Sequence, residues 1–280
     1  DVIQFFLFMP QMESLGARVV FAAFPDIVGL LANDPSAKKI AVQPLAISDI
    51  HYHAQLLDLP YRLGIKHPKD VPCRIPYLYA NSQKSAEWQL ALESVKELRV
   101  GLVWAGNPSH AGDHFRSASI NIFAPLAGIP GVRFLGLQKG EGVKEAKCAP
   151  EGLDFEWLGD QFANFDDTAA VIANLDLVIS VDTSVAHLAA ALGKPVWMLA
   201  SLRNPDWRWT DHGNGNAWYP NLLVFRQEIA DDWLDLVKKQ IRPRLAELLQ
   251  KTGSDSGWME FLWAVDVSPI GVEHLPWSDM

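Results

Sequence analysis

The chain has 280 residues, of which 49% are hydrophobic, and a formal net charge of −9. This charge argues against a broad nucleic-acid surface, since such surfaces are basic. The apolar runs are shorter than the roughly 20 residues of a membrane helix, so no integral membrane segment is expected. Two cysteines, Cys73 and Cys148, form neither a CxxC motif nor a disulfide framework. We therefore expect a cytoplasmic protein without a structural metal.

The first part of the chain alternates between helical and strand patterns. We predict helices over residues 1–15, 26–34 and 54–64, and strands over 17–24 and 38–43. A doubly wound domain begins with a strand and a turn, which we expect upstream of Asp1. A proline-rich crossing over 71–85 and a connecting helix over 86–98 lead out of this part. We interpret residues 1–96 as an N-terminal, acceptor-side Rossmann-like half that is incomplete.

The second part repeats this alternation more regularly. Its strands read as apolar on both faces, which indicates a parallel sheet covered by helices on both sides. We interpret residues 97–250 as a second Rossmann-like domain and residues 251–280 as a linker with an unassigned tail. The predicted strands are 99–106, 132–138, 155–159, 175–181, 195–200 and 222–227, and the predicted helices are 120–128, 141–147, 167–174, 183–192 and 231–250.

A polar cluster interrupts the apolar pattern at the end of the predicted strand 175–181. Asp182, Thr183 and Ser184 follow this strand and begin a helix, and His187 lies on the same helix face as Thr183. Unpaired amides and the helix dipole at such a position suit a phosphate. A simple helix cap with a buried histidine also explains the pattern. We favour a ligand site because an unpaired buried imidazole would cost free energy.

Two other strands deliver polar residues to the same predicted edge. The loop "GNPSHAGDHFRS" follows the first strand of the second domain and includes Asn107 and Arg116, whose guanidinium suits a diphosphate. Gln138 and Lys139 end the next strand. An exposed polar loop and a solvated lysine remain alternatives. Parallel strands bring their carboxyl ends to one edge, so convergence of the three segments favours a common site.

Two further features favour structural roles. His51 and His53 lie on one face of an extended segment, and without a third ligand nearby we favour a place on the acceptor side over a metal pair. Trp207 and Trp209 in "PDWRW" suit stacking on a base or sugar, although core packing is the simpler interpretation.

Taken together, these motifs resemble glycosyltransferase family 9, the heptosyltransferase-like domains, in the version found behind tetratricopeptide repeats in bacterial proteins. The resemblance covers residues 1 to about 250, and its stretches are "DVIQF", "GLVWAGNPSH", "FLGLQKG", "DLVISVDTSVAHLAAALGKPVW", "PDWRW" and "WYPNLLVFRQ". It implies an α/β fold of GT-B type, in which two Rossmann-like domains with doubly wound parallel sheets face a cleft. The C-terminal domain would hold the nucleotide-sugar, and tetratricopeptide repeats would precede this chain.

The resemblance also implies roles for individual residues. Asp1 matches the aspartate that acts as general base on the acceptor hydroxyl. The nucleotide-sugar would be held by three groups of residues: Thr183, Ser184 and His187 on the diphosphate with Asp182 beside the sugar or capping the helix, Asn107 and Arg116 in a closing loop, and Gln138 and Lys139 near the nucleoside.

The function implied is an inverting transfer of a sugar from a nucleotide-diphospho-sugar to a hydroxyl acceptor, without metal or other cofactor. The acceptor would be a glycan, a lipid-linked molecule or a protein. Two alternatives remain open. One is a non-catalytic binding module of the same fold, and the other is a sugar-nucleotide epimerase, which would turn over without an acceptor.

Overall fold

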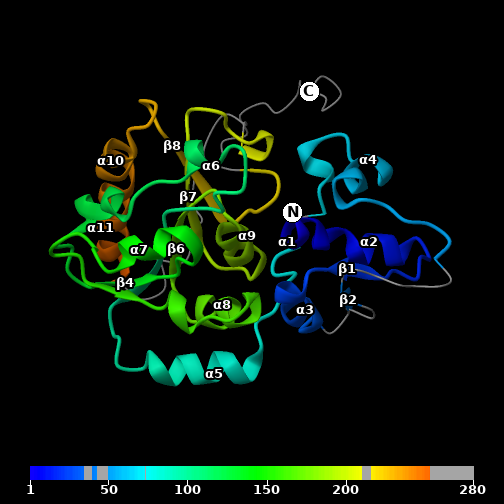
Figure 1. The fold of residues 1–280 in the computed structure, drawn as a ribbon, viewed down its shortest axis with the longest axis horizontal. Helices are drawn as coiled ribbons and strands as arrows, with labels where there is room; N and C mark the ends of the chain where they lie inside the picture. The colour runs from blue at the N-terminus through cyan, green and yellow to red at the C-terminus, as the bar shows by residue number, and fades with distance from the viewer. Residues whose placement is uncertain (35–39, 43–49, 73, 210–215, 253–280) are drawn as a thin grey trace.

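In the computed structural model, residues 1–34, 40–42, 50–72, 74–209 and 216–252 are described, and they form two α/β units that pack side by side (Figure 1). The first unit holds a small parallel sheet in which β1 pairs with β2. Its elements are α1 (Val2–Phe5), η1 (Phe6–Phe8), α2 (Met9–Ser14), β1 (Phe21–Ala23), α3 (Pro25–Ala32), β2 (Ile40–Val42), η2 (Leu56–Asp58), α4 (Leu59–Arg62) and η3 (Pro68–Asp70).

The second unit contains six parallel strands in the order β5-β4-β3-β6-β7-β8. This order confirms the predicted doubly wound parallel sheet. The elements are α5 (Ser82–Ala91), β3 (Leu98–Val103), α6 (Asp113–Arg116), η4 (Ile120–Leu126), β4 (Val132–Gly136), η5 (Gly140–Gly142), α7 (Val143–Ala146), β5 (Phe155–Trp157), η6 (Gly159–Gln161), α8 (Phe165–Ile172), β6 (Leu177–Val181), α9 (Ser184–Ala191), β7 (Val196–Ala200), η7 (Trp207–Trp209), β8 (Leu222–Arg226), α10 (Trp233–Leu236), the π-helical η8 (Val237–Ile241) and α11 (Arg242–Thr252). Residues 253–280, most of the predicted tail, lie outside the described residues.

Prolines explain where the predicted helices were wrong. The helix predicted over 1–15 is divided into α1, η1 and α2, and Pro10 near the start of α2 has no N–H to donate to the preceding turn. The helix predicted over 120–128 is the 3₁₀-helix η4, which contains Pro125. In the segment 231–250, a π-helical turn precedes Pro243.

The predicted connecting helix begins earlier, at α5, because Asn81 caps it through a bond from Lys84 N at 3.1 Å.

Side chains of alternate strand residues enter two separate cores, one on each face of the large sheet. Val178, Val196 and Leu222 point to the face that α8 and α9 cover. Ile179 and Trp197 point to the opposite face, which is covered by η4, η8 and α11. This alternation is the period of two that a strand imposes.

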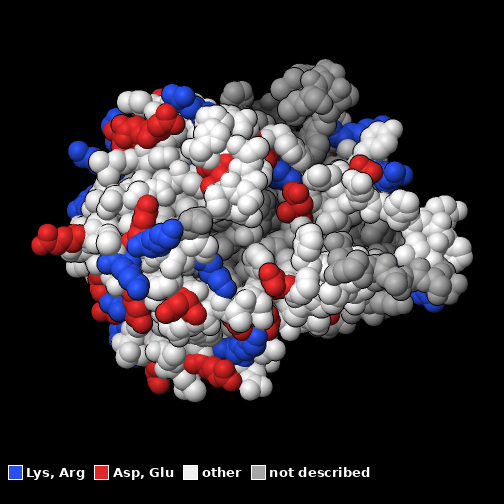
Figure 2. Space-filling model, viewed as in Figure 1, with Lys and Arg blue, Asp and Glu red and all other residues white. Residues whose placement is uncertain are grey.

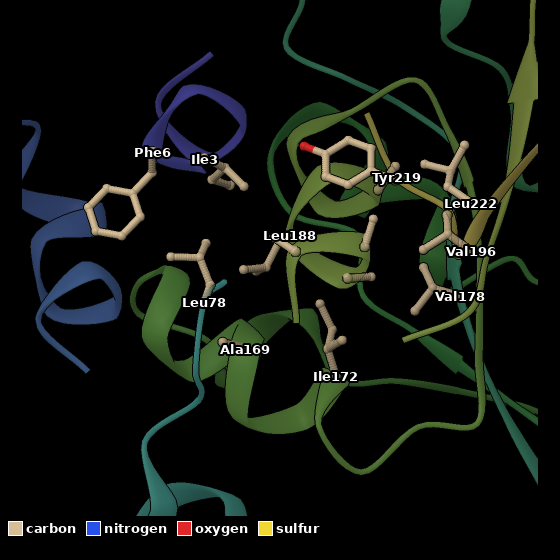
Figure 3. Packing of buried hydrophobic residues seen from close by; sticks show 14 of the residues in the cluster. Ile3, Phe6, Leu78, Ala169, Ile172, Val178, Leu188, Val196, Tyr219 and Leu222 are labelled. Atoms are coloured by element: carbon tan, nitrogen blue, oxygen red, sulfur yellow. The ribbon is translucent and has the colours of Figure 1, made fainter. Parts of the chain in front are cut away.

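The core on the α9 face continues into the first unit. Figure 3 shows Ile3 and Phe6 on one side of Leu188 and the strand residues on the other. At the junction, Phe5 and Phe8 both meet the edge of Trp218, with ring centroids 5.7 and 6.4 Å apart. The two units therefore share one continuous apolar core.

Candidate functional site

The strand order places a topological switch point between β3 and β6. The chain leaves β3 toward β4 on one side, whereas β6 continues toward β7 and β8 on the other. Val103 at the end of β3 lies opposite Ser180 near the end of β6. The loop after β3 and the N-terminus of α9 therefore meet at the position where open parallel sheets bind ligands.

The N-terminus of α9 has no side-chain cap. Thr183 occupies the N-cap position, but its hydroxyl pairs with the hydroxyl of Ser180 at 3.0 Å and does not bond to the helix amides. By contrast, Asn164 caps α8 with a complete capping box. The interpretation of Thr183 as a simple cap is therefore wrong, and the first turn of α9 keeps amides that suit an anion. Ser184 is exposed at this turn.

His187 lies one turn into α9 and is held from two sides. Its Nδ1 is 3.0 Å from the hydroxyl of Tyr219, and its Nε2 is 4.0 Å from Oδ1 of Asp182. The imidazole therefore has a protein partner, so the inference that an unpaired buried imidazole favours a ligand was wrong, and the simpler alternative of a satisfied buried histidine holds for this side chain. The ring of Trp209 packs on the imidazole, with centroids 5.4 Å apart. Burial lowers the pKa of His187 well below its ordinary value, and the charges of Arg208 and Arg116 lower it further. The imidazole is therefore neutral at pH 7.

Asp182 is also shifted by its surroundings. Burial raises the pKa of its carboxyl, and the negative charge of Asp206 adds to the rise. The indole N–H of Trp209 opposes this rise by acting on the carboxyl, although its geometry lies outside that of an ordinary hydrogen bond. The positive charges of Arg116 and Arg208 oppose it as well. A carboxyl and an imidazole with opposed shifts in one place are typical of a functional site.

The loop after β3 is fixed by Gln138 at the end of β4. Oε1 of Gln138 accepts bonds from the amides of Trp104 and Ala105 at 3.1 and 3.0 Å, and its Nε2 donates to the carbonyls of Ala105 and Lys139. Gln138 is 2% exposed. It therefore shapes the loop and has no free polar group for a nucleoside. Lys139 donates through Nζ to the carbonyl of Phe162 and not to the switch point.

Arg116 is held in place by Asp113, a residue that the sequence analysis did not single out. Oδ1 of Asp113 accepts from Nε of Arg116 at 3.1 Å, and its Oδ2 accepts from the hydroxyl of Ser117 at 2.8 Å. Gly106 packs against this cluster, because a Cβ there would lie 2.5 Å from Oδ1 of Asp113. Asn107 is exposed, and its side chain accepts from Ser109 N at 3.0 Å. The loop therefore presents a fixed guanidinium near α9.

Arg208 of the "PDWRW" motif connects the large sheet unit to Asp1 at the start of the first unit. Arg208 donates to Asp1 at 2.7 Å, to Oε1 of Gln4 at 2.6 Å and to both oxygens of Asp206 at 3.0 and 2.9 Å. Its side chain is 9% exposed. This guanidinium joins the first unit to the large sheet unit, and its charge also acts on Asp182 and His187.

Trp207 and Trp209, by contrast, belong to the core. Trp209 is 2% exposed, and Trp207 packs on Trp218 with centroids 5.7 Å apart. Their interpretation as packing residues is confirmed. Arg208, which lies between them, makes the polar contacts to Gln4, Asp206 and Asp1, and these contacts were not predicted from the sequence.

His51 and His53 are exposed, and within the described ranges no three His, Cys, Asp or Glu side chains gather closely enough to hold a metal ion. No helix in the described part of the chain has the length and apolar character needed to cross a membrane. On the face seen in Figure 2, basic and acidic side chains are interspersed.

Residues 131–205 match the family model described as glycosyltransferase family 9 (heptosyltransferase). This part of the large sheet unit is similar to glycosyltransferase family 9. This segment runs from β4 past the end of β7 and includes Gln138, Lys139, the uncapped start of α9 and His187. Asn107, Arg116 and Arg208 lie outside the matched family 9 segment.

A curated relative is similar to this chain over a longer stretch than the family 9 segment. Protein FlbA of Caulobacter vibrioides is 32% identical over 168 residues, which is 58% of this chain but 28% of that protein. The chain therefore spans little more than a quarter of that relative.

Two solved structures overlap this chain in part. The ADP-heptose lps heptosyltransferase II of E. coli has 15% identity and a TM-score of 0.45, with 64% of this chain and 55% of that chain covered. The glycosyl transferase family 9 protein of Veillonella parvula has 13% identity and a TM-score of 0.44, with 76% and 64% covered.

Proposed function

We propose that this chain is a glycosyltransferase of GT-B type that binds a nucleotide-diphospho-sugar at the N-terminus of α9 and transfers the sugar to a hydroxyl acceptor. The observation that carries the proposal is the uncapped start of α9 at the switch point, with Arg116 on one side and buried His187 behind it. The family 9 match covers this same turn. Exposed helix amides and a fixed guanidinium are the groups that bind diphosphates.

The proposed reaction is a single displacement with inversion. Asp1 accepts the proton of the acceptor hydroxyl, the acceptor oxygen forms a bond to the anomeric carbon, and the bond from that carbon to the diphosphate breaks. The nucleoside diphosphate leaves with the electron pair. Arg208 holds Asp1 through Oδ1, which leaves Oδ2 to take the proton. The amides of α9 and the charge of Arg116 stabilise the leaving diphosphate, so we propose that no metal is needed.

The test begins with titration of the full chain with ADP, GDP and UDP, followed by the tryptophan fluorescence or by calorimetry. At least one nucleotide should bind. Arg116→Met should weaken that binding about 10-fold to 100-fold, because a hydrogen bond to a charged group contributes about 1.5–3 kcal/mol. The control is Arg62→Met on α4, an exposed arginine paired with Asp58 at 3.6 Å, which should bind normally. The failure of all three nucleotides to bind would refute the proposal.

A non-catalytic binding module is the second candidate, and the ion pair of Asp1 with Arg208 favours it, because it gives this carboxylate a structural role that needs no acceptor substrate. Nucleotide binding without hydrolysis or transfer from any nucleotide-sugar would support this candidate. Asp1→Asn separates the two: it should spare nucleotide binding in both cases, but it removes turnover only in an enzyme.

A further inference from the structure

A chain of hydrogen bonds runs from the first unit to His187. The hydroxyl of Tyr77 lies 3.1 Å from the carbonyl oxygen of Ile3 in α1 and 3.2 Å from the hydroxyl of Tyr219. The hydroxyl of Tyr219 in turn lies 3.0 Å from Nδ1 of His187. Tyr219 is fully buried and its ring points toward the side on which Ile3 lies (Figure 3). We call these four groups the hydroxyl relay.

The direction of each bond in the hydroxyl relay follows from counting protons. A carbonyl only accepts, so the single hydroxyl proton of Tyr77 is donated to Ile3. The bond between the two tyrosines must then use the proton of Tyr219. Tyr219 has no second proton, and its contact with His187 therefore requires a proton on Nδ1. The relay thus fixes the neutral imidazole as the tautomer with a bare Nε2.

The bare Nε2 lies on the ligand side of α9. It is 4.0 Å from Oδ1 of Asp182, on the loop that begins the helix. The other side-chain charges that act on the imidazole are those of Arg208 in η7 and Arg116 in α6. Phosphate oxygens and a bare Nε2 are both acceptors, so they cannot bond to each other until the nitrogen gains a proton.

We propose that Tyr77 and Tyr219 are positioning residues that hold His187 in this tautomer, so that binding of a nucleoside diphosphate at α9 is coupled to uptake of one proton by Nε2. This inference rests on the proposed function of the same site. The relay stays intact on protonation, because Nδ1 donates to Tyr219 in the neutral and the cationic imidazole alike. The phosphate groups of the ligand add negative charge beside Nε2, which favours the protonated imidazole.

The coupling gives affinity a defined pH dependence. Where the bound protein holds the extra proton and the free protein does not, affinity should fall tenfold for each unit of rising pH. Burial keeps the free imidazole neutral at pH 7, so we expect this window to include neutral pH. A protein in which Nε2 already carried a proton in the free state would show no such slope from His187.

The first test is nitrogen-15 NMR of histidine side chains in the full chain, with the His187 signals assigned by their loss in His187→Gln. In the free protein at pH 7.5, Nδ1 should give the shift of a protonated nitrogen and Nε2 that of a bare one. A proton on Nε2 in the free protein would overturn the inference. This measurement needs no ligand and no activity.

The second test is calorimetry with whichever of ADP, GDP and UDP binds, in two buffers of different ionisation enthalpy. The wild-type protein should take up a proton that His187→Gln does not. Tyr77→Phe removes the acceptor on residue 77 to which Tyr219 donates, so we expect the Tyr219 proton to turn toward Nδ1, Nε2 to become the protonated nitrogen and uptake to disappear. Tyr79→Phe, an exposed tyrosine of the same segment, should behave as the wild type.

The outcomes separate the two levels of the argument. Nucleotide binding without proton uptake would refute the coupling and leave the proposed function standing. Failure of every nucleotide to bind would refute the proposed function and the coupling with it. A Tyr77→Phe variant that is less stable but keeps the wild-type tautomer and uptake would show that the tyrosine is merely structural, which also overturns the inference.

Discussion

Replacing Arg208 by methionine tests the polar junction between the first unit and the large sheet unit. The guanidinium is 9% exposed and bonds to Gln4, Asp206 and Asp1. Methionine keeps much of the apolar contact with the ring of Trp207, which lies 4.7 Å from the guanidinium carbon, but removes every donor. The variant therefore isolates the polar part of the junction.

The partners of Arg208 differ in their access to water, and this sets the expected loss. Gln4 is 1% exposed, and leaving its oxygen without a donor costs about 1–3 kcal/mol. The side chains of Asp206 and Asp1 are 32% and 53% exposed, so water replaces much of what they lose, and each pair contributes about 0–1 kcal/mol. We expect Arg208→Met to lower the free energy of unfolding by about 1–5 kcal/mol in all, most of it from Gln4.

The assay is urea unfolding followed by tryptophan fluorescence, with Arg203→Met as the matched control. Arg203 forms one ion pair, with Asp231 at 3.1 Å, and both side chains are more than half exposed, at 56% and 60%. The control should lose less than about 1 kcal/mol. Equal losses in the two variants would refute the argument that Arg208 is a buried connection between the units.

Three other substitutions test the site and its surroundings by the same unfolding assay. Gln138→Leu should lower the free energy of unfolding by at least about 2 kcal/mol and weaken nucleotide binding, because two loop amides lose their acceptor. The exposed control Gln83→Leu should change neither quantity, and equal effects in the two variants would contradict the role assigned to Gln138. Asp182→Asn should be more stable than the wild type at pH 7. The folded carboxyl has a raised pKa, so wild-type stability falls as pH rises through it, and the difference should vanish below the unfolded value of about 3.9; a destabilised variant at pH 7 would contradict this. Gly159→Ala should lose more than about 2 kcal/mol because its Cβ would collide with the backbone oxygen of Gln138, whereas Gly29→Ala in α3, where the nearest atom is 3.8 Å away, should gain about 0.5–1 kcal/mol; equal effects would contradict the packing argument.

The large sheet could be predicted because its signal is local. The central strands β6 and β7 are apolar runs, and the polar residues after β3 and β6 mark where two strands end. Parallel topology then brings Arg116 and His187 to one edge without further information. The first unit has shorter strands, of three residues each, and prolines that divide its helices, so its pattern predicts the element types better than their boundaries.

The polar contacts that complete the site could not be predicted, because they join residues distant in sequence. Arg208 and Gln4 are 204 positions apart, and Tyr77 and Tyr219 are 142 apart. Gln138 had the right location but a different role, since only the fold shows that both ends of its amide are already bonded. A clue was present in "PDWRW", where a charged residue stands between two tryptophans and so must be buried with partners.

The apolar core shared by the two units limits how the molecule can open. Phe5 and Phe8 close around Trp218 at the junction, and each large aromatic side chain buries about 150–250 Å². Swinging the units apart would return these rings to water at a cost of several kcal/mol. The two units should therefore unfold as one cooperative body rather than as independent lobes.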